Sequence, residues 1–356
     1  KGNTVPAGVC FNRVRSGMME SKTKEAASRA KRKTGFFTLF MYYVLDYFEL
    51  YYMNNSKVLK VAVIGVGAMG RNHARSYSSI KGASLVGVAD VNESLGRKIA
   101  KTYHTKFYAS YLDLISNEKP QAVSIVVPTS LHFKVAMDCI NHGISVLVEK
   151  PLTSTVEEAE KLVREAKKRK VVILAGHIER YNPVIVKLQK LINSGKFGDI
   201  LSIVVKRVGL YPPRVRDVNV VTDLAVHDLD IICSLLGQTP TRVYARGGRS
   251  LNNQRIDHAE IFLDFDRSSC FIQVNWITPI KIRTLSITGK KGFAEIDYVA
   301  QKLDIYKSNN NTGLPAGFQE FLSKFGAPQK EQIRLKGEEP LRLELEDFIQ
   351  AARLNR

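Results

Sequence analysis

Short apolar runs alternate with amphipathic stretches in the first half of the chain. The apolar runs lie at residues 57–65, 84–90, 122–130, 145–151 and 171–177. They are brief and rich in Val, Ile and Ala, which predicts buried strands. The stretches between them, such as 155–170, have the 3.6-residue period of helices, and Thr155 is a suitable N-cap. This alternation predicts a doubly wound α/β domain with a parallel sheet.

The pattern changes after Gly176. Helices are predicted at 182–195 and 221–237, with a strand at 199–209 between them. Between 241 and 306 the chain holds short alternating runs joined by turn residues, which predict a largely antiparallel open sheet. One face of such a sheet packs on helices, and the other face can receive a twin subunit.

A loop at 308–317 and an amphipathic helix at 341–354 end the second half. We therefore expect an N-terminal extension at 1–56, a doubly wound α/β domain at 57–177 and an α+β domain at 178–356.

The composition suits two globular domains, since 356 residues and 44% hydrophobic content are enough for two cores. Lys and Arg (53) exceed Asp and Glu (34), which favours an anionic partner: nucleic acid, anionic lipid or a phosphorylated small molecule. The four cysteines have no C-x-x-C spacing, which is typical of a reducing compartment, and we expect the cytoplasm.

The first 52 residues differ from the rest. The segment GFFTLFMYYVLDYFELYYM is long enough to suggest a membrane anchor, but it contains Asp46 and Glu49. Each acid costs about 2.5–3.5 kcal/mol in a spanning helix, which argues against an anchor. We expect the folded chain to begin near Met53, with the preceding text outside the fold.

The first predicted strand runs directly into Gly65-Val66-Gly67-Ala68-Met69-Gly70, a G-x-G-x-x-G pattern that opens a helix. In this context the first glycine permits a tight turn, the second admits a pyrophosphate, and the third allows close helix packing. Asp90 follows the second strand at about the spacing of the acid that binds a ribose 2′-hydroxyl. Its carboxylate would repel a 2′-phosphate, so the pattern favours NAD over NADP.

Two other segments carry chemistry. Glu149-Lys150-Pro151 ends the strand at 145–151, at the sheet edge where ligands bind, and an ammonium there can steady a developing alkoxide. The segment VTDLAVHDLD places Asp223, His227 and Asp230 on one helical face beside apolar stripes. A charged row in such surroundings must line a wet cleft or find partners.

The motifs GVGAMG, EKP and DLAVHDLD together resemble the Gfo/Idh/MocA dehydrogenases, over about residues 57–306. The resemblance implies that Lys150, Asp223 and His227 face the nicotinamide of NAD from two domains. It also implies that the glycine loop contacts the cofactor through Gly65, Gly67, Ala68, Met69 and Gly70. Further cofactor contacts are implied for Asp90, Pro128, Thr129, His132, Glu149 and Lys150. In VPTSLH, Thr129 replaces the Asn that is common in the family.

Within the family, GHIERYNP at 176–183 and VKRVGLYPPRVRDV look most like the branch that oxidises UDP-N-acetylglucosamine at C3. Relatives continue past the final helix with a segment that packs back across the domains. The resemblance therefore implies that a chain ending at Arg356 lacks that segment.

The helix at 221–237 has residues for proton transfer. His227 has an ordinary pKa of about 6.5, which suits a base that takes a hydroxyl proton while hydride leaves the same carbon. We expect Asp223 to orient the ring and stabilise its charged form. We expect Asp230 to be structural, as a cap or a salt-bridge partner. A metal site is the alternative, but no thiolate or second His is near in sequence, so we predict none.

Arginines flank the segment Tyr211-Pro212-Pro213, namely Arg207, Arg214 and Arg216. Planar guanidiniums can grip a diphosphate, which favours a nucleotide sugar over a bare polyol. Tyr181 and Asn182 are candidates for hydrogen bonds to sugar hydroxyls, and Pro183 is expected to start a helix.

These observations predict an NAD-dependent dehydrogenase of a nucleotide sugar that forms a homo-oligomer, a dimer or tetramer, through the open sheet face. Three alternatives stay open: oxidation of an uncharged polyol such as an inositol, a dinucleotide-binding regulator without catalysis, and nucleic-acid binding. The third rests on charge alone, because no nucleic-acid motif is present. The intact Lys150, Asp223 and His227 argue against a regulator.

Overall fold

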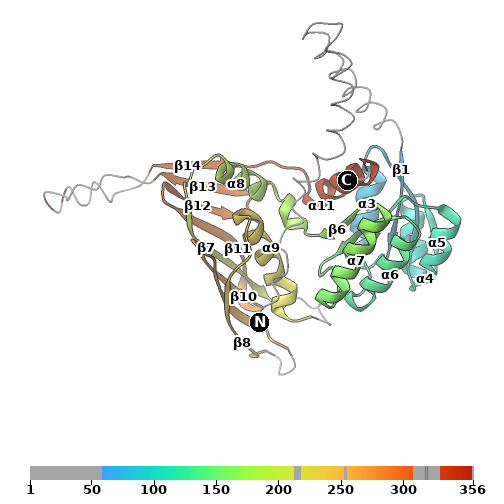
Figure 1. Ribbon diagram of the computed structural model, residues 1–356, viewed down its shortest axis with the longest axis horizontal. Helices are drawn as coiled ribbons and strands as arrows, with labels where there is room; N and C mark the ends of the chain where they lie inside the picture. The colour runs from blue at the N-terminus through green and yellow to red at the C-terminus, as the bar shows by residue number, and fades with distance from the viewer. Residues whose placement is uncertain are drawn as a thin grey trace, which may run out of the picture. The chain divides into compact units, whose positions relative to one another are not determined.

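The computed structural model describes residues 58–211, 218–251, 255–307, 317, 319 and 329–354 (Figure 1). The predicted extension and its aromatic segment lie outside the described residues. The chain divides into two compact units. One holds the chain up to Val148, Thr155–Leu174 and the chain from Glu346; the other holds Glu149–Ser154 and Ala175–Leu345. Lys150 therefore groups with the unit that also contains the predicted catalytic helix.

A six-stranded sheet forms the centre of the first unit. Its strands are β1 (Leu59–Ile64), β2 (Ala83–Ala89), β3 (Lys106–Tyr108), β4 (Ala122–Ile125), β5 (Ser145–Glu149) and β6 (Ile173–Gly176). They run in the order β3-β2-β1-β4-β5-β6, with parallel neighbours. This is the Rossmann order, so the predicted doubly wound sheet is confirmed.

Helices cover this sheet. They are α3 (Gly70–Ser79), α4 (Glu93–Thr102), α5 (Tyr111–Glu118), α6 (Thr129–Asn141) and α7 (Val156–Arg169). Thr155 caps α7 by accepting from the N–H of Glu158, as predicted. The sequence pattern missed β3, because a three-residue strand is too short to show a period, and it also missed α5, which has eight residues.

An eight-stranded sheet forms the second unit. Its strands are β7 (Ile200–Leu210), β8 (Arg242–Gly248), β9 (His258–Asp264), β10 (Ser269–Asn275), β11 (Ile277–Gly289), β12 (Gly292–Asp297), β13 (Lys302–Lys307) and β14 (Lys330–Arg334). The order is β14-β13-β12-β11-β7-β10-β9-β8. Among the strand pairings described in this second sheet, only that of β7 with β10 is parallel. This confirms the predicted largely antiparallel sheet.

One face of this sheet is covered and the other is open. Along β10, Cys270, Ile272 and Val274 are buried in the core, whereas Phe271 between them is 38% exposed. The covered face packs on α8 (Pro183–Asn193) and α9 (Val226–Leu236), which lie along it in Figure 1. This alternation is the period-two signal by which the sequence predicted a half-buried sheet.

Three shorter details complete the second unit. A 3₁₀ turn, η1 (Ile178–Tyr181), precedes α8, which begins at Pro183 as predicted. The turn before α9, η2 (Val221–Ala225), is a π-helix. The last helix, α11 (Pro340–Leu354), spans the division between the units. In the part of the chain that the structure describes, no helix combines the length and the apolar character needed to cross a bilayer.

Candidate active site

The loop between β1 and α3 is shaped by what its glycines lack. Gly65 has φ +88°, and a Cβ there would collide with the carbonyl oxygen of Val126. A Cβ on Gly70 would overlap the carbonyl oxygen of Gly65. A Cβ on Gly67 would meet no described heavy atom within 4 Å. The first and third glycines therefore permit close packing, and the second leaves the open space that a pyrophosphate requires beside a helix N-terminus.

Asp90, directly after β2, ties this loop in place. Its Oδ2 accepts from the main-chain N–H of Val66 at 2.7 Å, and its Oδ1 accepts from the N–H of Asn92 at 2.8 Å. Each carboxylate oxygen keeps a further lone pair that can accept from a ribose hydroxyl. The residues present therefore fit a dinucleotide with an unmodified ribose.

The VPTSLH segment joins β4 to α6. Pro128 is the N-cap residue and Thr129 the first residue of α6. The ring of His132 is buried, and its Nε2 lies 2.8 Å from the carbonyl oxygen of Val127. His132 thus orders the turn that carries Pro128 and Thr129. The cofactor contact expected of His132 stays a prediction.

Lys150 follows the last residue of β5 and meets η2. Its Nζ donates to the carbonyl oxygen of Asp223 at 3.0 Å and lies 3.5 Å from Oδ1 of the same residue. Both side chains are about one-fifth exposed, at 19% and 22%. The EKP and D-x-x-x-H motifs, 73 residues apart, therefore meet within one unit.

Glu149, next to Lys150, lies against the end of β6. Its Oε2 accepts from the N–H of Lys150 at 3.2 Å. A Cβ on Gly176 would meet the Glu149 Cα at 3.1 Å and a carboxylate oxygen at 3.3 Å, so the glycine allows this close approach.

His227 lies in the first turn of α9. Its Nδ1 is buried and makes no hydrogen bond to any described residue. Burial lowers the pKa of His227 well below 6.5, and the positive charges of Lys150 and Arg207 lower it further. The imidazole is therefore neutral at physiological pH, which is the form that accepts a proton.

The structure differs from the expected Asp223–His227 pairing. The carbonyl and carboxylate of Asp223 hold Lys150, and no hydrogen bond joins Asp223 to His227. The cause is the π turn over Val221–Ala225, because a π turn holds more residues than an α turn. A spacing of four residues therefore no longer puts two side chains one above the other.

Asp230 has the structural role that the sequence suggested. It accepts from Arg180 in a bidentate pair at 2.7 and 2.6 Å, and His177 Nδ1 lies 3.6 Å from its Oδ2. Burial lowers the pKa of His177. Sequence reasoning missed His177, although it lies in the GHIERYNP motif. No group of three or more His, Cys, Asp or Glu side chains suited to a metal occurs among the described residues.

The structure does not support Arg207 as a diphosphate ligand. Its side chain is buried, its Nε lies 2.9 and 2.8 Å from the two oxygens of Asp228, and its Nη1 donates to Glu179 at 3.0 Å. Asp228 is completely buried, so the pair holds α9 on β7. The sequence could not reveal this, because the acids come from segments 21 and 28 residues away.

The other predicted substrate residues are placed as follows. Asn182 is buried and caps α8: its Oδ1 accepts from the N–H of Val184 at 3.3 Å and from Gln301 at 3.0 Å. These bonds argue against a sugar contact for Asn182. Tyr181 is half-buried in η1 and its predicted role stays a prediction. Arg214 and Arg216 lie outside the described residues.

A dinucleotide loop in one unit, and in the other a Lys bonded to the turn before a helix that carries a neutral His, are typical of nicotinamide-dependent oxidoreductases. The model of the oxidoreductase family with the NAD-binding Rossmann fold matches residues 59–177, and that of the Gfo/Idh/MocA C-terminal domain matches residues 185–295. The chain belongs to the Gfo/Idh/MocA family and is an NAD-binding oxidoreductase.

Individual relatives agree with this assignment. The chain is 31% identical to UDP-N-acetylglucosamine 3-dehydrogenase of Acidithiobacillus ferrooxidans over 301 residues, 84% of this chain and 90% of the relative. A solved structure of that enzyme superposes with TM-score 0.73 at 29% identity, with the same coverage. Inositol 2-dehydrogenase of Rhodococcus jostii is 34% identical over 196 residues, 54% of each chain.

Proposed function

We propose that this enzyme uses NAD to oxidise a ring hydroxyl of a nucleotide sugar. The proposed substrate is UDP-N-acetylglucosamine, and the proposed position is its C3 hydroxyl. The observation that carries the proposal is the bond from Lys150 to the Asp223 carbonyl, one helical turn before His227. It joins an ammonium from the end of a sheet strand to the helix with the neutral imidazole. The similarity to UDP-N-acetylglucosamine 3-dehydrogenase over most of both chains supports the substrate.

In this proposal His227 removes the hydroxyl proton and Lys150 stabilises the alkoxide that forms. NAD, when bound, supplies the nicotinamide that accepts the hydride. The sugar carbon loses a hydride and its oxygen loses a proton, which leaves a ketone, so atoms and electrons balance. Because burial and neighbouring cations lower the pKa of His227, its protonated form readily returns the proton to water.

The test exchanges the proposed base. We expect His227→Ala to lower kcat about 10²- to 10⁴-fold, the usual contribution of general base catalysis. NAD binding should be unchanged, because the cofactor loop belongs to the other unit. Arg164→Gln, an exposed change on α7, is the control and should keep full activity. Unchanged turnover in His227→Ala would refute the assignment.

A second candidate is oxidation of an uncharged polyol. The engagement of Arg207 by Asp228 and Glu179 favours it, because one predicted diphosphate ligand is no longer available. The similarity to an inositol 2-dehydrogenase also favours it. A substrate panel decides between the candidates: equal kcat/KM with and without the UDP moiety would select the polyol. No turnover of any panel member would favour the non-catalytic regulator.

We propose further that two copies associate through the open face of the eight-stranded sheet. Tyr244, Phe262, Phe271 and Val204 form one cross-strand row on that face and are 38–59% exposed. Such a contiguous apolar row is typical of an interface.

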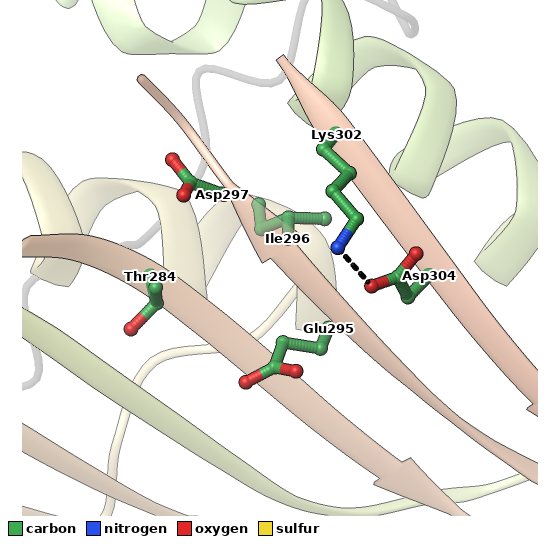
Figure 2. Close-up of a pocket in the computed structure, with 6 residues that line it drawn as sticks. All are labelled: Thr284, Glu295, Ile296, Asp297, Lys302 and Asp304. Atoms are coloured by element: carbon green, nitrogen blue, oxygen red, sulfur yellow. Dashed lines mark ion pairs between the residues drawn. The ribbon is translucent and has the colours of Figure 1, made fainter. Parts of the chain in front are cut away.

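A second part of the open face holds the pocket in Figure 2, which is lined by Thr284, Glu295, Ile296, Asp297, Lys302 and Asp304. Figure 2 shows the ion pair between Lys302 and Asp304, which both lie on β13. These residues lie on β11, β12 and β13, so the pocket is not the candidate active site. We expect Phe271→Glu to give monomers by light scattering; an unchanged mass would refute this interface.

We place the reaction in the reducing cytoplasm. Cys139, Cys233 and Cys270 are free thiols in the described residues, which supports this location.

A further inference from the structure

Two arginines stand side by side on the covered face of the eight-stranded sheet. Arg283 of β11 pairs in register with Arg207 of β7. Leu285 and Val205, two positions along the same strands, are buried in the core, so both arginines point to the helix-covered face. Like charges directly opposite each other are destabilising, so each guanidinium needs an anionic neighbour.

The two arginines differ in their partners. Arg207 is bonded to Asp228 and Glu179. Arg283 donates through Nη1 only to the main-chain oxygens of Val208, at 3.0 Å, and Ile282, at 3.2 Å. Within the described residues it makes no ion pair. Burial, first, and the charge of Arg207 lower the pKa of Arg283, although the carboxylates of Asp228, Glu179 and Asp223 act in the opposite direction.

Among the described residues, room for a small side chain remains next to this pair. Gly209, two residues beyond Arg207 on the same face, has no side chain. A Cβ there would meet only Lys281 Cα, at 3.8 Å, among the described heavy atoms. Trp276 is level with Gly209, because β10 pairs with β7 and ends at Asn275 opposite Val208. The buried Nε1 of Trp276 makes no hydrogen bond to a described residue.

We infer that Arg283 is the anion-binding group of the active site and takes the diphosphate of the substrate. This inference rests on the proposed nucleotide-sugar function and assigns to Arg283 the contact expected from Arg207. Its guanidinium keeps Nη2 and Nε, which can form a bidentate pair with phosphate oxygens. Arg283 lies opposite Arg207, and the partner of Arg207, Asp228, directly follows His227 in α9. The charge of Arg283 is also the smallest of the causes that lower the pKa of His227.

The test is a titration with UDP. Binding is monitored by calorimetry and by the fluorescence of Trp276, the single tryptophan. NAD is kept saturating so that its phosphates occupy the glycine loop. We expect Arg283→Gln to weaken UDP binding about 10- to 100-fold, the usual effect of losing a charge-assisted hydrogen-bonded pair. Arg283→Lys keeps the positive charge but loses the planar guanidinium that binds in a bidentate way. Its affinity for UDP should lie between those of the wild type and Arg283→Gln.

Controls separate binding from folding and from the choice of substrate. Arg164→Gln removes one exposed charge and should bind UDP as the wild type does. Uridine should bind the wild type much more weakly than UDP. Equal binding of UDP by the wild type and a folded Arg283→Gln would overturn the inference. If Arg283→Gln does not fold, equal affinities of the wild type for uridine and UDP would overturn it instead.

The two proposals can fail separately. If UDP binding depends on Arg283 but UDP-N-acetylglucosamine is not oxidised, the anion site stands and the proposed substrate is wrong. If UDP-N-acetylglucosamine is oxidised and Arg283→Gln retains wild-type KM, the proposed function stands and the anion site is wrong.

Discussion

The glycine loop of the first unit and the charged cluster of the second, formed by Arg207, Asp228 and Glu179, are built in opposite ways. The loop works by lacking side chains: Gly65 and Gly70 have no room for another atom, and Gly67 leaves open space. The cluster works through long side chains, since Arg207 and Asp228 are buried only because they are paired. One added atom should therefore damage the loop, whereas one deleted charge should damage the cluster.

The largest effect expected is on the cluster. Arg207→Met leaves Asp228 as an unpaired buried carboxylate, which costs about 3–5 kcal/mol of unfolding free energy. Urea denaturation measures this loss. The double variant Arg207→Met/Asp228→Leu removes both charges and should recover much of the stability. If the double variant is less stable than the single one, charge matching is not what the pair provides.

The next largest effect is a difference in stability between substitutions at two glycines of the loop, Gly70 and Gly67. Gly70→Ala forces a Cβ onto the Gly65 carbonyl and should cost about 1–3 kcal/mol, the usual cost of overpacking. Gly67→Ala meets no described atom and should keep wild-type stability, yet weaken NAD binding by filling the phosphate space. Denaturation and NAD titration of both variants test this. Equal stability losses at the two positions would contradict it.

A smaller effect, on NAD affinity, is expected at Asp90, whose charged carboxylate holds the glycine loop through Val66. Asp90→Asn removes the carboxylate that accepts from Val66 and that we expect to bind the ribose. NAD affinity should fall about tenfold, which corresponds to about 1.5 kcal/mol, the lower end for a hydrogen bond to a charged group, because the amide oxygen of Asn can still accept. NADP should bind better than it does to the wild type, because the repulsion of its 2′-phosphate is gone. Comparison of the two dissociation constants checks both effects.

The smallest effect is the pH dependence of stability. The pKa of His227 is lowered in the folded state, so below pH 6.5 the unfolded chain binds a proton that the folded one does not. Its contribution is fully present above pH 6.5 and is lost as the pH falls towards the folded pKa, by at most about 1.4 kcal/mol per pH unit. His177 acts in the same direction. His227→Gln should flatten the slope between pH 6.5 and 5; an unchanged slope would contradict the burial of a neutral ring.

The two regions also differ in how far the sequence could predict them. The glycine loop was predictable because turn, phosphate space and packing depend on consecutive residues around Gly65, Gly67 and Gly70. The positions of Arg207 and Arg283 were not, since their register depends on strands far apart in sequence. The π turn at Val221–Ala225 also escaped prediction, because ordinary helical spacing was assumed for Asp223 and His227.

The central claim is that hydride leaves C3 of a nucleotide sugar while His227 takes the hydroxyl proton. The direct measurement mixes the enzyme with NAD and UDP-N-acetylglucosamine carrying deuterium at C3, and follows the absorbance and mass of the reduced nicotinamide. The account predicts reduced cofactor that contains the deuterium, formed at least about a hundred times more slowly by His227→Ala. No reduction, reduction without deuterium, or an equal rate in His227→Ala would contradict it.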